Sequence, residues 1–165
     1  MNEIMIDIEK FLDLSNYATD TRVSRRKGTG GSQEFFTPYS LVKRICDKIS
    51  EADWSNSEKT FLEPSFGNGA FVCYIIYNRI LHGVSWKDTL KTLFGVELLP
   101  DNVQETKDRI ISLLSEMEIQ FNKEEALKIM DHNLVCSDFF KWDFENWCPI
   151  KELEPKKKPK SKKLF

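Results

Sequence analysis

The sequence predicts an α/β domain in which about three short parallel strands alternate with flanking helices. Three short apolar runs, at residues 61–62, 93–98 and 134–137, are separated by longer segments whose apolar residues recur at helical spacing. The first run leads into a turn that contains Gly67 and Gly69, and a helix-like run follows. A strand, a tight glycine turn and a helix start form the arrangement in which backbone approaches a bound cofactor closely.

Composition and charge limit the class of protein. The 165 residues are 41% hydrophobic and 12% aromatic, which suffices for one small domain with a core. The formal net charge is −2, but residues 151–165 carry +5 and the remainder therefore about −7. An acidic body with a basic tail argues against a basic nucleic-acid-binding domain. We divide the chain into residues 1–32, a helix and a basic Gly-rich loop, the domain at 33–148, and a disordered Lys-rich tail at 149–165.

Cysteine usage and the absence of targeting signals predict the compartment. The four cysteines form no CxxC pair and stand mostly in apolar runs, so we expect buried, reduced thiols and no disulfides. Neither histidine has clustered partners, and no metal site is predicted. The N-terminus lacks the apolar run of a signal peptide, and no stretch is long enough to span a membrane. These features predict a soluble, cytoplasmic protein.

The segments before the first strand combine helical and loop-like patterns. Residues 3–14 have the spacing of a short amphipathic helix. A basic loop follows and runs into a Gly-rich stretch; its cations are Arg22, Arg25, Arg26 and Lys27. It is either a solvated linker or a segment that contacts a phosphate backbone or closes over a ligand. Thr37 is the expected N-cap of the next helix, with Pro38 at the first helical position. Phe36, just before it, belongs either to the core or to the face of a flat ligand.

Three further helices are predicted between the strands. The first spans about 86–92, and the second runs from Pro100 to about Met117. For the third, Asn122 is the expected N-cap, three residues before Glu125, and the helix continues to about Met130. These helices supply the crossovers that parallel strands require.

An acidic residue stands at the carboxyl end of each of the last two predicted strands. Glu97 follows the second strand, where such folds hold ribose hydroxyls with paired acceptor oxygens; the alternative is a cap or a salt-bridge partner. Asp138 follows the third strand and precedes Phe139 and Phe140. A carboxylate beside aromatic rings suits an adenine base, whose amino group would donate to the acid.

Four motifs in this order resemble the cofactor-binding half of N6-adenine DNA methyltransferases, especially type I modification subunits and amino-methyltransferases of the gamma arrangement. The motifs are Phe36-Thr37-Pro38, Glu63-Pro64-Ser65-Phe66-Gly67-Asn68-Gly69-Ala70-Phe71, Gly95-Val96-Glu97-Leu98-Leu99-Pro100 and Ser137-Asp138-Phe139-Phe140. The resemblance covers roughly residues 33–140. It implies a partial Rossmann-like fold that binds S-adenosylmethionine, in a protein connected with DNA methylation and restriction-modification.

The resemblance also implies a role for each motif residue. Glu97 would hold the ribose, Asp138 the adenine amino group, and Phe139 would lie on the ring. The remaining residues of the motifs are expected around the methionine part of S-adenosylmethionine or next to it. They are Phe36, Thr37, Pro38, Glu63, Ser65, Gly67, Gly69 and Phe71.

The motif that performs methyl transfer in that family is not found in these residues. It consists of Asn or Asp, two prolines and an aromatic residue, and it holds the adenine amino nitrogen in line with the methyl group. The chain contains no Pro-Pro pair; Cys148-Pro149-Ile150 is not a substitute. No catalytic residue is therefore predicted.

Three functions remain open at this point. The chain is a cofactor-binding protein without methyl transfer of its own, one piece of a split methyltransferase completed by another chain, or a module that binds DNA or protein through its basic tail and Leu164-Phe165. DNA contact would involve the tail and the basic loop at 22–27. In the complete family fold a fourth strand lies beside the first. Its absence here predicts a homodimer or a partner protein at that sheet edge, with residues 142–147 as the candidate cover.

Overall fold

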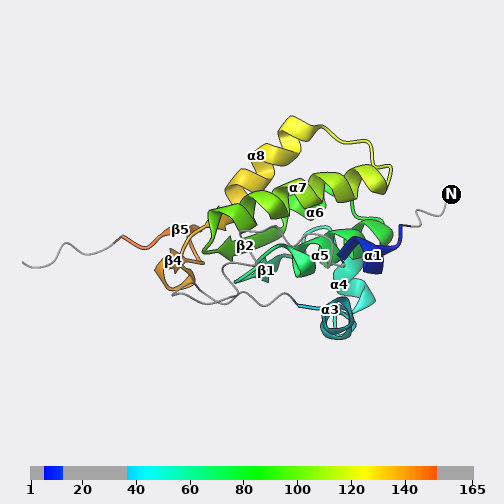
Figure 1. Ribbon diagram of the computed structural model, residues 1–165, viewed down its shortest axis with the longest axis horizontal. Helices are drawn as coiled ribbons and strands as arrows, with labels where there is room; N and C mark the ends of the chain where they lie inside the picture. Colours follow the sequence, from blue (N-terminus) through cyan, green and yellow to red (C-terminus); the bar gives the residue numbers. More distant parts are fainter. Residues whose placement is uncertain (1–5, 13–36, 152–165) are drawn as a thin grey trace, which may run out of the picture.

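The computed structural model describes residues 6–12 and 37–151. The basic loop, the Lys-rich tail from residue 152, the outer parts of the predicted first helix and Phe36 lie outside the described residues. The helices and strands, drawn in Figure 1, are α1 (Ile8–Leu12), α3 (Tyr39–Cys46), α4 (Glu51–Ser55), β1 (Phe61–Glu63), α5 (Ala70–Leu81), α6 (Trp86–Lys91), β2 (Leu93–Glu97), α7 (Pro100–Glu116), α8 (Lys123–Asn133), β3 (Leu134–Cys136), the 3-10 helix η1 (Phe139–Lys141), β4 (Trp142–Asp143) and β5 (Cys148–Pro149).

The central sheet has three strands in the order β1-β2-β3, and all of them are parallel. The register pairs Phe61 with Leu93 and Gly95 with Leu134. The predicted α/β class with three parallel strands and flanking helices is therefore confirmed. Among the described residues β1 pairs only with β2, so its other edge carries no strand partner there.

The two faces of the sheet are covered differently. On one face, Phe61 stacks on Trp54 of α4 with ring centroids 5.4 Å apart, and the guanidinium of Arg79 from α5 lies 5.0 Å from the same ring. On the opposite face, the Phe94 ring meets the indole of Trp147 at 4.8 Å, while Leu62 beside it is 49% exposed. The hydrophobic core thus lies mainly between the first face and the helices.

Local sequence signals place the helices well. The run 70–81 is helix α5 as predicted, and Gly69 is its N-cap with a left-handed φ of +85°. Asn122 caps α8 by accepting the backbone N–H of Glu125 at 3.0 Å. This helix ends at Asn133 rather than at Met130. Asn133 is buried and donates to the carbonyl of Leu90 at 2.9 Å, a tertiary contact that extends the helix past its apolar pattern.

The expectation for the start of helix α3 is wrong. Its N-cap is Pro38, in an extended conformation and without a side-chain cap, so Thr37 precedes the cap by one residue. The buried stripe of the helix consists of Val42 and Cys46, and Ile45 is 49% exposed.

Residues 142–149 form an antiparallel hairpin of β4 and β5 and do not pair with β1. The predicted role of 142–147 as a cover for the β1 edge is therefore corrected. The Trp147 indole N–H donates to the carbonyl of His132 at 2.7 Å, and its ring contacts Phe94, so the hairpin packs against β2 and the end of α8. Trp147 adopts a φ of +49°, which is unusual for a bulky residue.

The cysteines agree only in part with the prediction of buried thiols. Cys46 and Cys73 are buried and burial raises the pKa of both to about 11, but Cys136 and Cys148 are exposed. The exposed pair stands at the end of β3 and in the short strand β5. Across 6–12 and 37–151, none of the helices combines the length and the apolarity needed to cross a membrane.

Candidate functional site

A cavity of about 380 Å³ lies where the three parallel strands end. Its walls come from the turn after β1, from the end of β2 and from the segment after β3. The lining residues are Pro64, Ser65, Val96, Leu98, Ser137, Asp138, Phe139 and Phe140. Ligands of open α/β sheets bind outside the carboxyl ends of the strands, so the topology itself favours this position.

The cavity is mostly apolar and contains one carboxylate. Leu98 is 61% exposed and Phe140 is 85% exposed, an unusual degree for large apolar side chains. Asp138 Oδ1 accepts the backbone N–H of Phe140 at 2.9 Å and thereby starts the 3-10 helix that presents both phenylalanines. Among the described residues, the second oxygen of Asp138 accepts no hydrogen bond. An apolar cavity with one available acceptor suits a flat heterocycle that carries a donor group.

The glycine turn next to the cavity is held by helix α7. Thr106 Oγ1 donates to the carbonyl of Gly67 at 3.1 Å, and Arg109 Nη1 donates to the carbonyl of Asn68 at 2.7 Å. Gly67 and Gly69 both have positive φ, and a Cβ added to Gly69 would lie 2.6 Å from Thr106 Cγ2. The close approach of the turn to α7 therefore requires glycine at position 69.

The Glu97 side chain holds the glycine turn through hydrogen bonds. Its side chain is buried at 6% exposure, and its carboxylate accepts the backbone N–H of Gly67 at 2.9 Å and that of Leu99 at 2.9 Å. Asn102 Nδ2 is 3.4 Å from the same carboxylate. Glu97 does not line the cavity. Of the two interpretations of this acid, the structure therefore favours a capping role.

Glu63 at the end of β1 has a perturbed acidity. Burial raises the pKa of its carboxyl above the usual value, and a backbone hydrogen bond from the Ser65 N–H opposes this effect. That bond spans 3.3 Å. Ser65 itself is exposed and lines the cavity, so Glu63 positions the turn residue that faces the ligand space.

The structure brings together only some of the predicted site residues. Ser65, Asp138 and Phe139 line the cavity. A second group forms the adjacent turn and its supports; it consists of Glu63, Gly67, Gly69 and Glu97. A third group lies outside the cavity lining: Thr37 and Pro38 precede α3, and Phe71 is half-buried in the first turn of α5.

Sequence reasoning missed several residues that shape the site. The additional lining residues are Pro64, Val96, Leu98 and Ser137, to which no role was assigned, and the residues that hold the turn are Thr106 and Arg109. Phe140, the second of the two aromatics noted after Asp138, also lines the cavity. For Leu98 a signal existed, because an apolar residue directly after the acid that ends a parallel strand lies at the ligand end of the sheet. For Thr106 and Arg109 no local signal existed, since both read as ordinary residues of an amphipathic helix.

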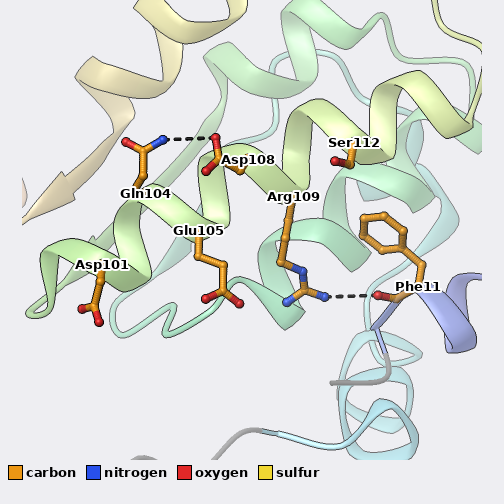
Figure 2. A pocket seen from close by; sticks show the side chains of 7 residues that line it. All are labelled: Phe11, Asp101, Gln104, Glu105, Asp108, Arg109 and Ser112. Carbon is orange, nitrogen blue, oxygen red and sulfur yellow. Dashed lines mark hydrogen bonds between the residues drawn. The ribbon is translucent and has the colours of Figure 1, made fainter. Parts of the chain in front are cut away.

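A second groove, of about 370 Å³, lies on the outer side of α7 beside α1. Figure 2 shows its lining residues, which are Phe11, Asp101, Gln104, Glu105, Asp108, Arg109 and Ser112. Arg109 Nη2 donates to the carbonyl of Phe11 at 3.4 Å, and the guanidinium lies 5.6 Å from the Phe11 ring. Arg109 therefore links α1 to the glycine turn. Within the described ranges, no cluster of three or more His, Cys, Asp or Glu side chains is suited to a metal ion.

Comparison with protein-family models, with curated proteins and with solved structures finds no match to this chain. The methyltransferase resemblance therefore rests on the four sequence motifs alone.

Proposed function

We propose that the cavity at the carboxyl ends of β1, β2 and β3 binds S-adenosylmethionine, in a domain of the Rossmann-like methyltransferase type. The adenine ring occupies the cavity, with its amino group donating to Asp138 and its faces against Leu98 and Phe139. The methionine part extends toward Ser65 and the glycine turn.

One observation carries this proposal. Ser65 follows β1, whereas Asp138 and Phe139 follow β3, yet the three residues line one cavity beside a glycine turn with left-handed φ values. Parts of the second, third and fourth motifs, which are far apart in the sequence, are thus neighbours in space. The lining also matches the chemistry of the cofactor, because an adenine ring needs apolar surfaces for its faces and an acceptor for its amino group.

The proposed activity of this chain on its own is cofactor binding without methyl transfer. Residues 1–165 contain no Asn or Asp followed by two prolines and an aromatic residue, the motif that orients the acceptor amino group in the family that the chain resembles. Without that group in line with the methyl carbon, proximity and orientation contribute nothing to the transfer step.

A second candidate is the cofactor-binding piece of a split adenine methyltransferase. The observation that favours it is the edge of β1, which has no strand partner among the described residues, with Leu62 49% exposed beside it. A parallel strand from another chain would pair with this edge and cover Leu62. Copurification of a partner that carries the missing motif, together with methylation of adenine in DNA by the pair alone, would establish this alternative.

Isothermal titration calorimetry tests cofactor binding. Wild-type protein is titrated with S-adenosylmethionine and S-adenosylhomocysteine. We expect micromolar dissociation constants, which correspond to a binding free energy of about −8 kcal/mol. Asp138→Asn keeps an oxygen for the Phe140 N–H but turns the amide NH2, a donor, toward the adenine amino group, so the affinity should fall at least about tenfold. Asp108→Asn, an exposed acid in the second groove, is the matched control and should bind like wild type. Absence of heat at millimolar ligand would refute the proposal.

A further inference from the structure

Glu97 is the acidic residue that motif comparison assigns to the ribose, but its contacts point elsewhere. Both carboxylate oxygens are engaged with groups of the protein: Oε2 accepts the Gly67 N–H at 2.9 Å, and Oε1 accepts the Leu99 N–H at 2.9 Å. The side chain is 6% exposed and forms no part of the cavity wall. Oε2 keeps a further lone pair, so it is the burial of the carboxylate and its place outside the cavity wall, rather than a full set of hydrogen bonds, that separate it from a ribose in the cavity.

The position of the carboxylate is also electrostatically favourable. Glu97 is separated from the start of helix α7 by only two residues, and the 17-residue helix directs the positive end of its dipole toward that terminus. Asn102 Nδ2, from the first turns of the same helix, lies 3.4 Å from Oε1. The acid therefore joins three elements, β2, the start of α7 and the glycine turn.

From these contacts we propose that Glu97 is a positioning residue for the glycine turn, and that the cavity recognises the adenine base of its ligand while tolerating loss of either ribose hydroxyl. This inference rests on the proposed function, because it specifies which part of the cofactor is read. Among the described residues, the side-chain oxygens of the cavity wall other than those of Asp138 come from Ser65 and Ser137. Neutral hydroxyls discriminate weakly, and Ser137 Oγ already lies 3.4 Å from the Asp138 carbonyl.

The first test compares ligands on the wild-type protein and needs no variant. S-adenosylhomocysteine and its 2′-deoxy and 3′-deoxy analogues are titrated under identical conditions by calorimetry. If Glu97 supports the turn only, the three dissociation constants should agree within about threefold. If Glu97 holds the ribose diol, loss of a hydrogen bond to a buried carboxylate should weaken binding by about tenfold or more.

Glu97→Gln provides the second test. The amide has one acceptor oxygen in place of two, so either Gly67 or Leu99 loses its partner and the turn is held less firmly. We expect the affinities for all three ligands to fall by the same factor, with their ratios unchanged. The Gly67 amide proton should move upfield in the ¹H–¹⁵N spectrum, because it loses a charged acceptor. In Asn102→Ala, the matched variant on the same carboxylate, that resonance should stay near its wild-type position.

The outcomes separate the two proposals. Equal binding of the three ligands supports sugar tolerance. Suppose that the deoxy analogues bind about tenfold more weakly than S-adenosylhomocysteine to wild type and equally well to Glu97→Gln. Glu97 is then the ribose ligand, which overturns this inference but leaves cofactor binding intact. If the deoxy analogues bind more weakly in the variant as well, the inference is also overturned, since another group then binds the ribose hydroxyls. Failure of every ligand to bind overturns the proposed function and this inference together. If Glu97→Gln does not fold, the wild-type comparison decides alone.

Discussion

Arg109 Nη1 donates a hydrogen bond of 2.7 Å to the backbone carbonyl of Asn68, in the middle of the glycine turn. The same guanidinium reaches the carbonyl of Phe11 in α1 at 3.4 Å, and the side chain is 5% exposed. One buried side chain of α7 thus fixes the turn beside the cavity and connects it to the N-terminal helix.

Replacement of this arginine should destabilise the protein. Arg109→Met keeps the length of the aliphatic stem but leaves two backbone carbonyls without their donor, and we expect a loss of about 2 kcal/mol in the free energy of unfolding. Urea unfolding measures the loss. Asp108→Asn, at the neighbouring exposed position, should change stability by less than about 0.5 kcal/mol. Equal stability of the two variants would contradict the role of Arg109.

Gly69 and Gly83 allow a matched comparison of backbone strain and close contact. Their φ values are +85° and +83°, but a Cβ on Gly69 would meet Thr106 at 2.6 Å, whereas a Cβ on Gly83 would meet no atom within 4 Å. Gly83→Ala should cost about 1–2 kcal/mol through the backbone alone. Gly69→Ala should cost about 1–3 kcal/mol more, because the methyl group must displace Thr106. Thermal unfolding measures the loss of stability in each variant. Equal losses in Gly69→Ala and Gly83→Ala would contradict the close contact between position 69 and Thr106.

The acidity of Glu63 predicts a dependence of stability on pH. Because burial raises its pKa above the ordinary value of 4.5, the stability that the protonated group contributes is complete below that value and is lost as the pH rises through the raised pKa. Glu63→Gln is neutral at every pH, so its melting temperature relative to wild type should increase between about pH 4 and pH 7.5. A difference that stays constant over this range would contradict the burial of an ionisable carboxyl.

A change at Phe140 should affect ligand binding without affecting the stability of the fold. Its side chain is 85% exposed and lines the cavity, so it contributes little to the core. Phe140→Ala should leave the free energy of unfolding within about 0.5 kcal/mol of wild type. Its affinity for S-adenosylhomocysteine should nevertheless fall several-fold, as apolar contact with the ligand is lost. Unchanged affinity would remove Phe140 from the site, and calorimetry on the two proteins decides this.

Local patterns in the sequence were sufficient for the elements between Phe61 and Cys136. Short apolar runs, the Asn122 cap and the glycine turn each act within a few neighbouring residues, and the structure has the corresponding strands and helices. The extension of α8 to Asn133 was missed because it depends on a hydrogen bond to the carbonyl of Leu90, a contact between distant segments.

The candidate site was predictable in composition but not in the division of roles. Asp138 and Phe139 were identified as ligand-facing residues because an acid and aromatics follow a parallel strand. Glu97 follows a strand in the same way, yet its carboxylate is buried against the Gly67 N–H. Which of the two acids faces the cavity depends on the path of the glycine turn. Thr106 and Arg109 of α7 hold that turn, and neither residue gives a sign of this role in the sequence.

The most direct test of the account is to locate the ligand on the protein. A ¹H–¹⁵N correlation spectrum of the ¹⁵N-labelled chain is recorded during titration with S-adenosylhomocysteine. The account predicts saturable shifts centred on the amides of Ser65, Leu98 and Phe139, with the amides of Gln104 and Asp108 in the second groove unchanged. Shifts confined to the second groove, or a spectrum that ligand leaves unaltered, would contradict cofactor binding at the carboxyl ends of the sheet.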